Sequence, residues 1–296
     1  MSERRELLGV SLSSPDKVLW PEQGVTKSDL ADYYVAVAAR MLPHVAGRPV
    51  TLVRCPSGSE TKCFYQRHPG AGGLLPHLKH VAVPGFEEPY LYIEDAAGLV
   101  ATVQHGTLEL HPWGVTVARP DRPDRIIFDL DPSEGLGFEA VVAAALDVRE
   151  RLQALGLVSF CKTTGGKGLH VVVPILPDVE WRQAKAFTKA LADAMSQDRP
   201  DLYLARISKA EREGRIFIDY LRNDPTSTAV GPYSTRSRPG APVSMPIAWE
   251  EVTPDLDPCA FTLSTVPDII GRKPDPWKEI HGVRQRLAPA VDQLGR

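Results

Sequence analysis

The 296-residue chain lacks any apolar run that approaches the roughly 18 residues a membrane-spanning helix needs. Its first ten residues also lack the apolar core of a secretory signal peptide. No internal repeat and no low-complexity tract occurs. These absences predict no membrane span, and we expect a cytoplasmic globular protein without a membrane partner.

The chain has no marked excess of either charge. Thirty-four Lys and Arg residues face 37 Asp and Glu residues, for a formal net charge of −3. Such a total does not by itself indicate a nucleic-acid partner. The basic residues nevertheless gather in a few segments, and we expect a basic stripe whose polyanion binding weakens as salt rises. Its members are Lys17, Lys27, Arg206, Lys209, Arg212, Arg215, Arg236 and Arg238.

Cysteine is sparse, and the four cysteines form no C-x-x-C pair. This pattern is typical of free thiols in a reducing compartment. Cys55 and Cys63 do lie close in sequence to His68, His77 and His80. A zinc site there is an alternative, although the spacing matches no standard zinc pattern.

Helical and strand patterns mix along the whole chain. Thr26 and Asp29 form a capping box for a first helix that Pro43 is expected to end, and Gly156 is a stop signal for a second. The mixture predicts an α+β fold with mixed or antiparallel sheets flanked by helices. We expect helices over residues 26–43, 138–155, 180–195 and 277–287, and strands over 49–54, 63–66, 90–94, 99–104, 108–111, 114–118, 125–131, 157–162, 169–176 and 215–221.

Two acids end an apolar strand pattern at residues 126–131. Asp129 and Asp131 share one face of that strand, with Cα atoms roughly 6–7 Å apart. Two neighbouring carboxylates repel each other, and a hard divalent cation such as Mg²⁺ or Mn²⁺ resolves the repulsion. Asp219, at the centre of a second apolar strand, could complete a three-carboxylate site for two metal ions. A solvated strand end remains the alternative.

A glycine-rich turn lies at residues 163–168. Its glycines allow backbone N–H groups to approach an anion, and Lys167 and His170 add donors suited to a triphosphate. The spacing is not that of a Walker A loop. Arg236 and Arg238 share a face if their segment is extended, and would suit a phosphate clamp. A plain turn and a solvated arginine pair are the alternatives.

Taken together and in order, these segments resemble the polymerase domain of bacterial ATP-dependent DNA ligase D, in the archaeo-eukaryotic primase superfamily. No single motif is decisive, but the ordered set is specific. The stretches that carry the resemblance are residues 15–21, 26–30, 33–34, 47–49, 108–114, 128–132, 165–170, 217–223 and 232–236.

The resemblance implies a primase-type catalytic core and a DNA-directed nucleotidyltransferase that prefers ribonucleotides. It implies two Mn²⁺ or Mg²⁺ ions, nucleoside triphosphate substrates, and DNA ends or gaps carrying a 5′-phosphate. It also implies Ku and a ligase as partners and a nucleoid-associated place in the cytoplasm. The implied roles are catalytic metal ligands at Asp129, Asp131 and Asp219, nucleotide contacts at Phe64, His111, Thr164, Lys167, His170 and Arg236, and 5′-phosphate contacts at Lys17 and Lys27.

The resemblance further implies one catalytic domain over residues 1–296. It would have a subregion of 5′-phosphate and base contacts at about 1–120, a palm-like subregion at about 121–250 and a tail at 251–296 that packs on it. No Lys-x-Asp-Gly ligase motif occurs, so we expect either a separate polymerase or one domain of a longer ligase. His105 stands where relatives usually have an apolar residue.

Two rival functions remain open. A haloacid-dehalogenase-like phosphatase would use Asp129 as its nucleophile, although such a fold normally places this motif on its first strand. A DNA-end-binding module without catalysis would bind ends independently of metal. Template-directed nucleotide addition to a gapped duplex separates all three.

Overall fold

The computed structural model describes residues 4–70, 76–206 and 213–294. The chain divides into two compact units, each built from separate stretches of sequence. The first contains residues 1–120, 230–245 and 259–275, and the second contains residues 121–229, 246–258 and 276–296. Lys209 and Arg212 of the expected basic stripe lie outside the described residues.

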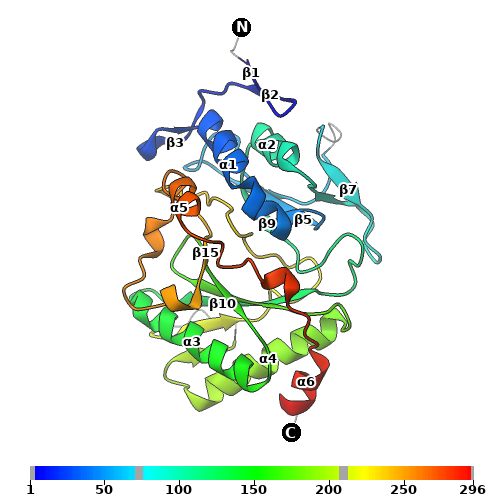
Figure 1. Cartoon of the computed structure of the whole chain (residues 1–296), viewed down its shortest axis with the longest axis vertical. Helices are drawn as coiled ribbons and strands as arrows, with labels where there is room; N and C mark the ends of the chain where they lie inside the picture. The colour runs from blue at the N-terminus through cyan, green and yellow to red at the C-terminus, as the bar shows by residue number, and fades with distance from the viewer. Residues whose placement is uncertain (1–3, 71–75, 207–212, 295–296) are drawn as a thin grey trace. The chain divides into compact units, whose positions relative to one another are not determined.

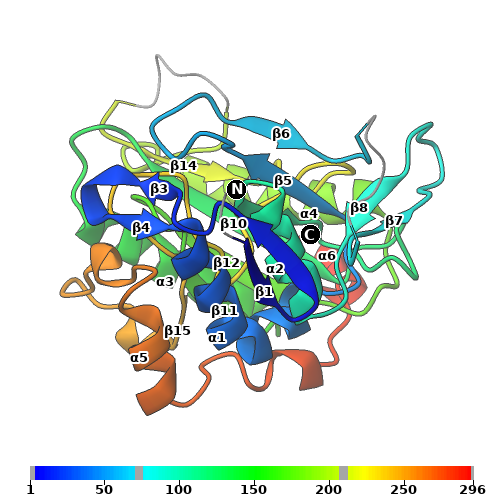
Figure 2. The ribbon, with the colours of Figure 1, turned by 90° about the horizontal axis from the view of Figure 1, so that it is seen from above.

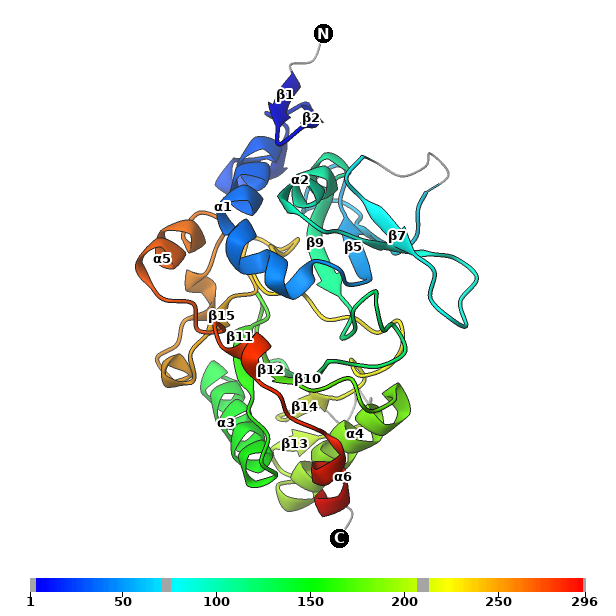
Figure 3. The same cartoon turned by 45° about the vertical axis from the view of Figure 1, so that its right-hand side comes forward.

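The first unit packs helices against short antiparallel sheets. The helices α1 (Lys27–Val45), α2 (Ala96–Gln104) and α5 (Val266–Arg272) lie together, with α5 beside α1 (Figure 3). Strand β5 is the centre of a three-stranded sheet in the order β6-β5-β9, and β6 runs along its edge (Figure 2). The strands are β1 (Arg4–Leu7), β2 (Val10–Ser13), β3 (Val18–Trp20), β4 (Val25–Thr26), β5 (Val50–Arg54), β6 (Phe64–Gln66), β7 (Lys79–Val81), β8 (Tyr90–Tyr92) and β9 (Thr107–Pro112).

Helix α1 begins with the predicted capping box. The Thr26 hydroxyl accepts a hydrogen bond from the Asp29 backbone N–H, and the Asp29 carboxylate accepts one from the Thr26 N–H. The predicted end at Pro43 is wrong, because the helix continues to Val45. A proline removes its own N–H and crowds the preceding turn, but it leaves the following residues free to stay helical.

Two predicted strands of the first unit are wrong. Residues 99–104 belong to helix α2, which starts where the Asp95 side chain accepts a hydrogen bond from the Gly98 N–H. Every residue from 98 to 103 is buried, so no alternation distinguished a strand from a buried helix. Residues 114–118 form bends and a turn instead of a strand.

The second unit is built on a six-stranded sheet in the order β13-β14-β10-β12-β11-β15. Neighbouring strands are antiparallel, apart from the parallel pair β13 and β14. Helices α3 (Phe138–Ala154) and α4 (Trp181–Asp198) lie on one side of this sheet (Figure 1). The strands are β10 (Arg125–Pro132), β11 (Phe160–Thr163), β12 (Leu169–Pro174), β13 (Tyr203–Leu204), β14 (Ile216–Asp219) and β15 (Pro246–Ile247).

The end of the chain closes the core of the second unit. Trp277 and Ile280 pack with Val172, Ile127 and Phe160. The Trp277 indole N–H donates to the Cys161 carbonyl at 2.9 Å. The predicted helix over 277–287 is wrong: a short 3₁₀ turn covers Ile280–Gly282, and α6 follows at Ala288–Leu294. Tertiary packing of Trp277, more than local helix propensity, fixes this stretch.

The α+β prediction is confirmed, because helices and a mixed sheet combine in one chain.

The expectation of free thiols is wrong for two cysteines. Cys55 and Cys63 form a disulfide, which also uses both thiols of the alternative zinc site. Cys161 and Cys259 are free, the first buried and the second exposed. In the described part of the chain, no helix is long and apolar enough to cross a membrane.

Candidate active site

Strand pairing in the second unit brings Asp129, Asp219 and His170 together. Asp129 on β10 lies directly opposite Asp219 on β14 and directly opposite His170 on β12. Directly paired residues of antiparallel strands project to the same face. Phe128 and Leu130, which alternate with the acids, are fully buried on the other face. Asp131 is exposed, two residues along β10 on the same face as Asp129.

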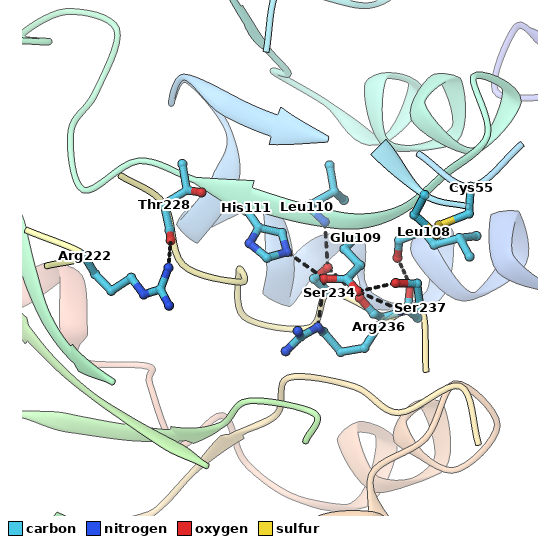
Figure 4. Close-up of polar contacts among 12 residues, drawn as sticks. Cys55, Leu108, Glu109, Leu110, His111, Arg222, Thr228, Ser234, Arg236 and Ser237 are labelled. Carbon is cyan, nitrogen blue, oxygen red and sulfur yellow. Dashed lines mark hydrogen bonds and ion pairs between the residues drawn. A yellow bond between two sulfur atoms is a disulfide. The ribbon is translucent and has the colours of Figure 1, made fainter. Parts of the chain in front are cut away.

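Two cationic or donor groups hold the Asp129 carboxylate. His170 Nε2 lies 3.2 Å from Asp129 Oδ1, and Arg222 Nε lies 3.3 Å from Oδ2. Arg222 Nη2 also lies 3.1 Å from Asp219 Oδ2, so one guanidinium bridges two carboxylates. Its Nη1 donates to the Thr228 carbonyl at 3.5 Å (Figure 4). Sequence reasoning missed the role of Arg222, although an arginine three residues after Asp219 is a visible signal.

Asn223 positions this arginine. Its side-chain amide accepts from the Ile127 N–H at 2.8 Å and donates to the Ile127 carbonyl at 2.7 Å. It also donates to the Tyr220 carbonyl at 2.8 Å, and the side chain is buried. The loop after β14 is therefore tied to β10 beside the carboxylates.

The pKa values of the cluster diverge. Burial would raise the pKa of Asp129, but the charges of His170 and Arg222 outweigh it and hold that pKa well below its usual range. Burial raises the pKa of Asp219, with Arg222 opposing the rise and Asp129 adding to it. Burial also lowers the pKa of His170 to about 4, with Lys162 adding to this effect and Asp129 opposing it. The imidazole is thus neutral at pH 7 and donates its Nε2–H to Asp129.

The donor chemistry of the cluster suits a hard divalent cation, since Asp129, Asp131 and Asp219 are carboxylates on adjacent paired strands. Yet no three potential metal ligands among the described residues gather closely enough to form a metal cage. Arg222 lies against the oxygens of Asp129 and Asp219 that such an ion would share. The carboxylates thus suit a divalent ion by their chemistry, and in this structure the Arg222 guanidinium contacts both Asp129 and Asp219.

The Thr164 hydroxyl closes the predicted glycine-rich turn. Thr164 Oγ1 donates to the Gly168 carbonyl at 3.1 Å, and the Thr164 N–H bonds to the same carbonyl. A Cβ on Gly168 would come within 2.5 Å of the Leu130 carbonyl, so only glycine lets the turn approach β10 this closely. Lys167 is exposed at the tip of the turn.

Buried Lys162 is a further basic residue that sequence reasoning missed. It lies opposite His170 in the β11–β12 pair, and its side chain is almost wholly buried. Its charge lowers the pKa of His170, after the larger effect of burial. A signal was available in the sequence: Lys162 and Thr164 are two residues apart, at the end of β11 and the start of its turn, and alternation places them on one face.

In the first unit, Glu109 is the centre of a second charged cluster. Its Oε2 lies 2.7 Å from His111 Nε2 and accepts a hydrogen bond from Arg236 Nε at 2.8 Å (Figure 4). Its Oε1 accepts hydrogen bonds from the Ser237 N–H and hydroxyl at 2.8 and 2.7 Å. Burial would raise the pKa of Glu109, but His111, Arg236 and Ser237 hold it well below its usual range. The structure thus brings His111 and Arg236 together through Glu109, which the sequence analysis had not singled out.

Phe64 lies on the edge strand β6, and the residue is 43% exposed. The Arg54 guanidinium lies over its ring, 5.0 Å from the centroid. Gln66 Oε1 accepts from Arg54 Nη1 at 2.8 Å and from His105 Nε2 at 3.0 Å. Burial and the Arg54 charge lower the pKa of His105 to about 4, so it is neutral. His105 therefore has a physical role: it holds the glutamine that holds Arg54.

Lys17 and Lys27 are adjacent in the first unit. The Lys27 N–H donates to the Lys17 carbonyl at 2.8 Å. The Lys27 ammonium is buried and donates to the Ser13 carbonyl and to Gln104 Oε1, whereas the Lys17 ammonium is exposed and donates to the Pro56 carbonyl. Burial, and then Lys17, lower the pKa of Lys27 to about 8.

Paired acids on antiparallel strands, beside a glycine turn with basic residues, are typical of a phosphoryl- or nucleotidyl-transfer site. The family described as "LigD, primase-polymerase domain" matches residues 26–277. The chain belongs to this family, and its class is that of DNA-directed nucleotidyltransferases.

Among curated proteins, the chain is 35% identical over its whole length to the "Multifunctional non-homologous end joining protein LigD" of Pseudomonas aeruginosa, of which it covers 36%. It is 37% identical over 86% of its length to the corresponding LigD protein of Mycobacterium tuberculosis, of which it covers 34%. The chain thus spans about a third of the length of these relatives.

Among solved structures, the polymerase domain of Mycobacterium tuberculosis ligase D in complex with DNA is similar, with a TM-score of 0.86 and 34% identity. The match covers 92% of this chain and 98% of that one. It confirms the fold over nearly the whole chain.

Proposed function

We propose that this chain performs template-dependent addition of nucleotides at DNA ends and gaps, with a preference for ribonucleotides. The observation that carries the proposal is the strand register that places Asp129 opposite Asp219 and beside His170. Similarity to LigD proteins supports end joining as the setting. Our proposal includes Ku and a ligase as partners and a place at the nucleoid.

The reaction joins the 3′-oxygen of a primer to the α-phosphorus of a nucleoside triphosphate, breaks the bond to pyrophosphate and releases the hydroxyl proton. When bound, two Mn²⁺ or Mg²⁺ ions would lower the pKa of that hydroxyl and offset charge on the leaving group. Asp129, Asp131 and Asp219 would hold them. Because Asp129 stays ionised over the whole physiological range, its ligand oxygens are ready without a proton loss.

The chain's other predicted residues divide into two further tasks. Thr164, Lys167 and His170 would hold the phosphates in the second unit. In the first unit, Phe64 would stack on the incoming base, His111 and Arg236 would contact the nucleotide, and the Lys17–Lys27 pair would bind the 5′-phosphate. The exposed ring of Phe64 and the exposed ammonium of Lys17 support these assignments.

The test offers a 5′-phosphorylated gapped duplex, Mn²⁺ and labelled ribo- or deoxyribonucleotides. We expect template-directed addition that Asp129→Asn lowers by at least about a thousandfold, because the lost charge stabilisation amounts to several kcal/mol. Asp201→Asn, an exposed acid of the same unit, is the matched control. Binding of DNA ends should remain in both variants.

The same experiment separates the rivals. Release of phosphate with a covalent aspartyl-phosphate and no template dependence would favour the phosphatase. End binding that Mn²⁺ leaves unchanged, without incorporation, would favour the silent module. Asp129 lies inside β10, between two antiparallel neighbours, which already sets it apart from a nucleophile at a strand end.

A further inference from the structure

The second unit contains a cavity that none of the assigned residues uses. It has a volume of about 630 Å³ and lies where α4 meets the edge strand β13 and the residues that flank β14. These elements lie side by side in Figure 3. Tyr220, which lines the cavity, follows Asp219 directly, so strand alternation directs it to the opposite face of the sheet.

The lining of the cavity is strongly cationic for a chain of net charge −3. Of the described residues, Lys189, Arg206 and Arg215 line it, together with one acid, Asp193. Lys189 Nζ lies 2.5 Å from Asp193 Oδ2, which accounts for that acid. Among the residues that the structure describes, Arg206 and Arg215 have no ion-pair partner, so two guanidinium groups are available to an anion.

The cationic groups share one space. Asp193 raises the pKa of Lys189 most, Tyr220 adds to the rise, and Arg206 opposes it. Such mutual effects require that Arg206 and Tyr220 approach Lys189. Ser196 and Gln197 add hydrogen-bonding groups to the same wall. A tyrosine beside guanidinium groups offers a stacking surface as well as charge.

The composition of the lining points to a ligand that carries both negative charge and rings. Arg206 follows β13 and Arg215 precedes β14, and both line the cavity together with Lys189 and Tyr220. Guanidinium groups suit phosphate oxygens, and a tyrosine ring suits stacking on a base.

We propose that this cavity binds the phosphodiester backbone of a single-stranded nucleic acid, at a site separate from the carboxylate cluster. Guanidinium groups bind phosphate oxygens in bidentate fashion, and the cavity supplies two of them with an ammonium and an aromatic ring. The assignment does not depend on nucleotidyl transfer, because it requires neither metal nor nucleotide.

The test measures binding of a fluorescent oligothymidylate by anisotropy, in chelator and without nucleotide, across a range of salt. The variant Lys189→Gln/Arg206→Gln/Arg215→Gln is compared with a control that removes the same charge from exposed residues of the same unit, Arg182→Gln/Lys278→Gln/Arg284→Gln. We expect about tenfold weaker binding for the cavity variant, and a salt slope reduced by about 2. The control should change affinity less than about twofold, because none of its three residues lines the cavity.

A second probe identifies the chemistry. An oligonucleotide with an uncharged methylphosphonate backbone should bind the wild type and the cavity variant equally weakly. Equal affinities of the cavity and control variants for the charged strand would overturn the proposal. So would a difference between them that persists on the uncharged strand, or a polyglutamate peptide that competes as well as the oligonucleotide. Thermal melting of both triple variants verifies that each is folded.

Discussion

The clusters around Glu109 and around Asp129 contain the same three kinds of side chain: a carboxylate, a histidine and an arginine. Glu109 accepts four short contacts of 2.7 to 2.8 Å, which use both of its oxygens. Asp129 has longer contacts of 3.2 and 3.3 Å, and it faces a second carboxylate whose pKa is raised. Short contacts thus use both oxygens of Glu109, and we expect the longer contacts of Asp129 to be the ones that a bound ligand exchanges.

The largest expected effect is a difference in the free energy of unfolding between variants of Glu109 and of Asp129. Glu109→Gln should lower the free energy of unfolding by about 3 kcal/mol, because it leaves Arg236 partly buried without its counter-charge. Asp129→Asn should cost less, about 1.5 kcal/mol, because its contacts with His170 and Arg222 are longer, at 3.2 and 3.3 Å. Urea unfolding in the presence of chelator measures both, and equal losses would break the comparison.

The disulfide is a second stabilising feature of the first unit, where it links the ends of the connection between β5 and β6. Cys55 and Cys63 are eight residues apart. Loop-closure entropy for such a loop predicts that Cys63→Ser lowers the free energy of unfolding by about 2.5 kcal/mol. Cys259→Ser, at an exposed free cysteine, is the control. If urea unfolding finds the two variants equally stable, the disulfide contributes nothing to the free energy of unfolding.

Arg222 tests whether the second cluster exchanges partners. Arg222→Gln should tighten Mn²⁺ binding about tenfold, a gain of ~1.4 kcal/mol, because the guanidinium no longer competes for the oxygens of Asp129 and Asp219. Electron paramagnetic resonance of free Mn²⁺ measures the affinity without any turnover, with Arg199→Gln as an exposed control. Unchanged or weaker Mn²⁺ binding would show that the arginine supports the site instead of occupying it.

The smallest effect concerns pH and the lysine pair. The pKa of Lys27 is about 8, below its usual value, so its charge is mostly present at pH 7 and mostly lost by pH 9. Preference for a 5′-phosphorylated over a 5′-hydroxyl gap should therefore fall about fivefold between those pH values. Lys27→Arg, which stays charged, should abolish the pH dependence. Anisotropy titrations at both pH values measure it, and a preference independent of pH in the wild type would remove Lys27 from the phosphate site.

The parts of the site that local pattern controls could be predicted. Apolar runs interrupted by single acids identified β10 and β14, and alternation placed Asp129 and Asp131 on one face. The Thr26 capping box predicted the start of α1. These features depend on neighbours within a few residues, which the sequence displays directly.

Features that depend on distant contacts could not be predicted. Glu109 and Arg236 are 127 residues apart, and nothing in either segment indicates the other. The cysteine pair and the bridging position of Arg222 depend in the same way on the folded chain. Helix α2 was misread because its burial is complete, which removes the periodicity that distinguishes helix from strand.

The paired acids lie where the pairing of β10 with β14 ends. Asp129 and Asp219 are the last residues that β10 and β14 pair, and beyond them the Asn223 side chain replaces the missing strand by bonding both backbone groups of Ile127. One amide thus ends the β10–β14 ladder next to the carboxylates. Changes in the loop that follows Asn223 can therefore alter the surroundings of the carboxylates while the acids keep their register.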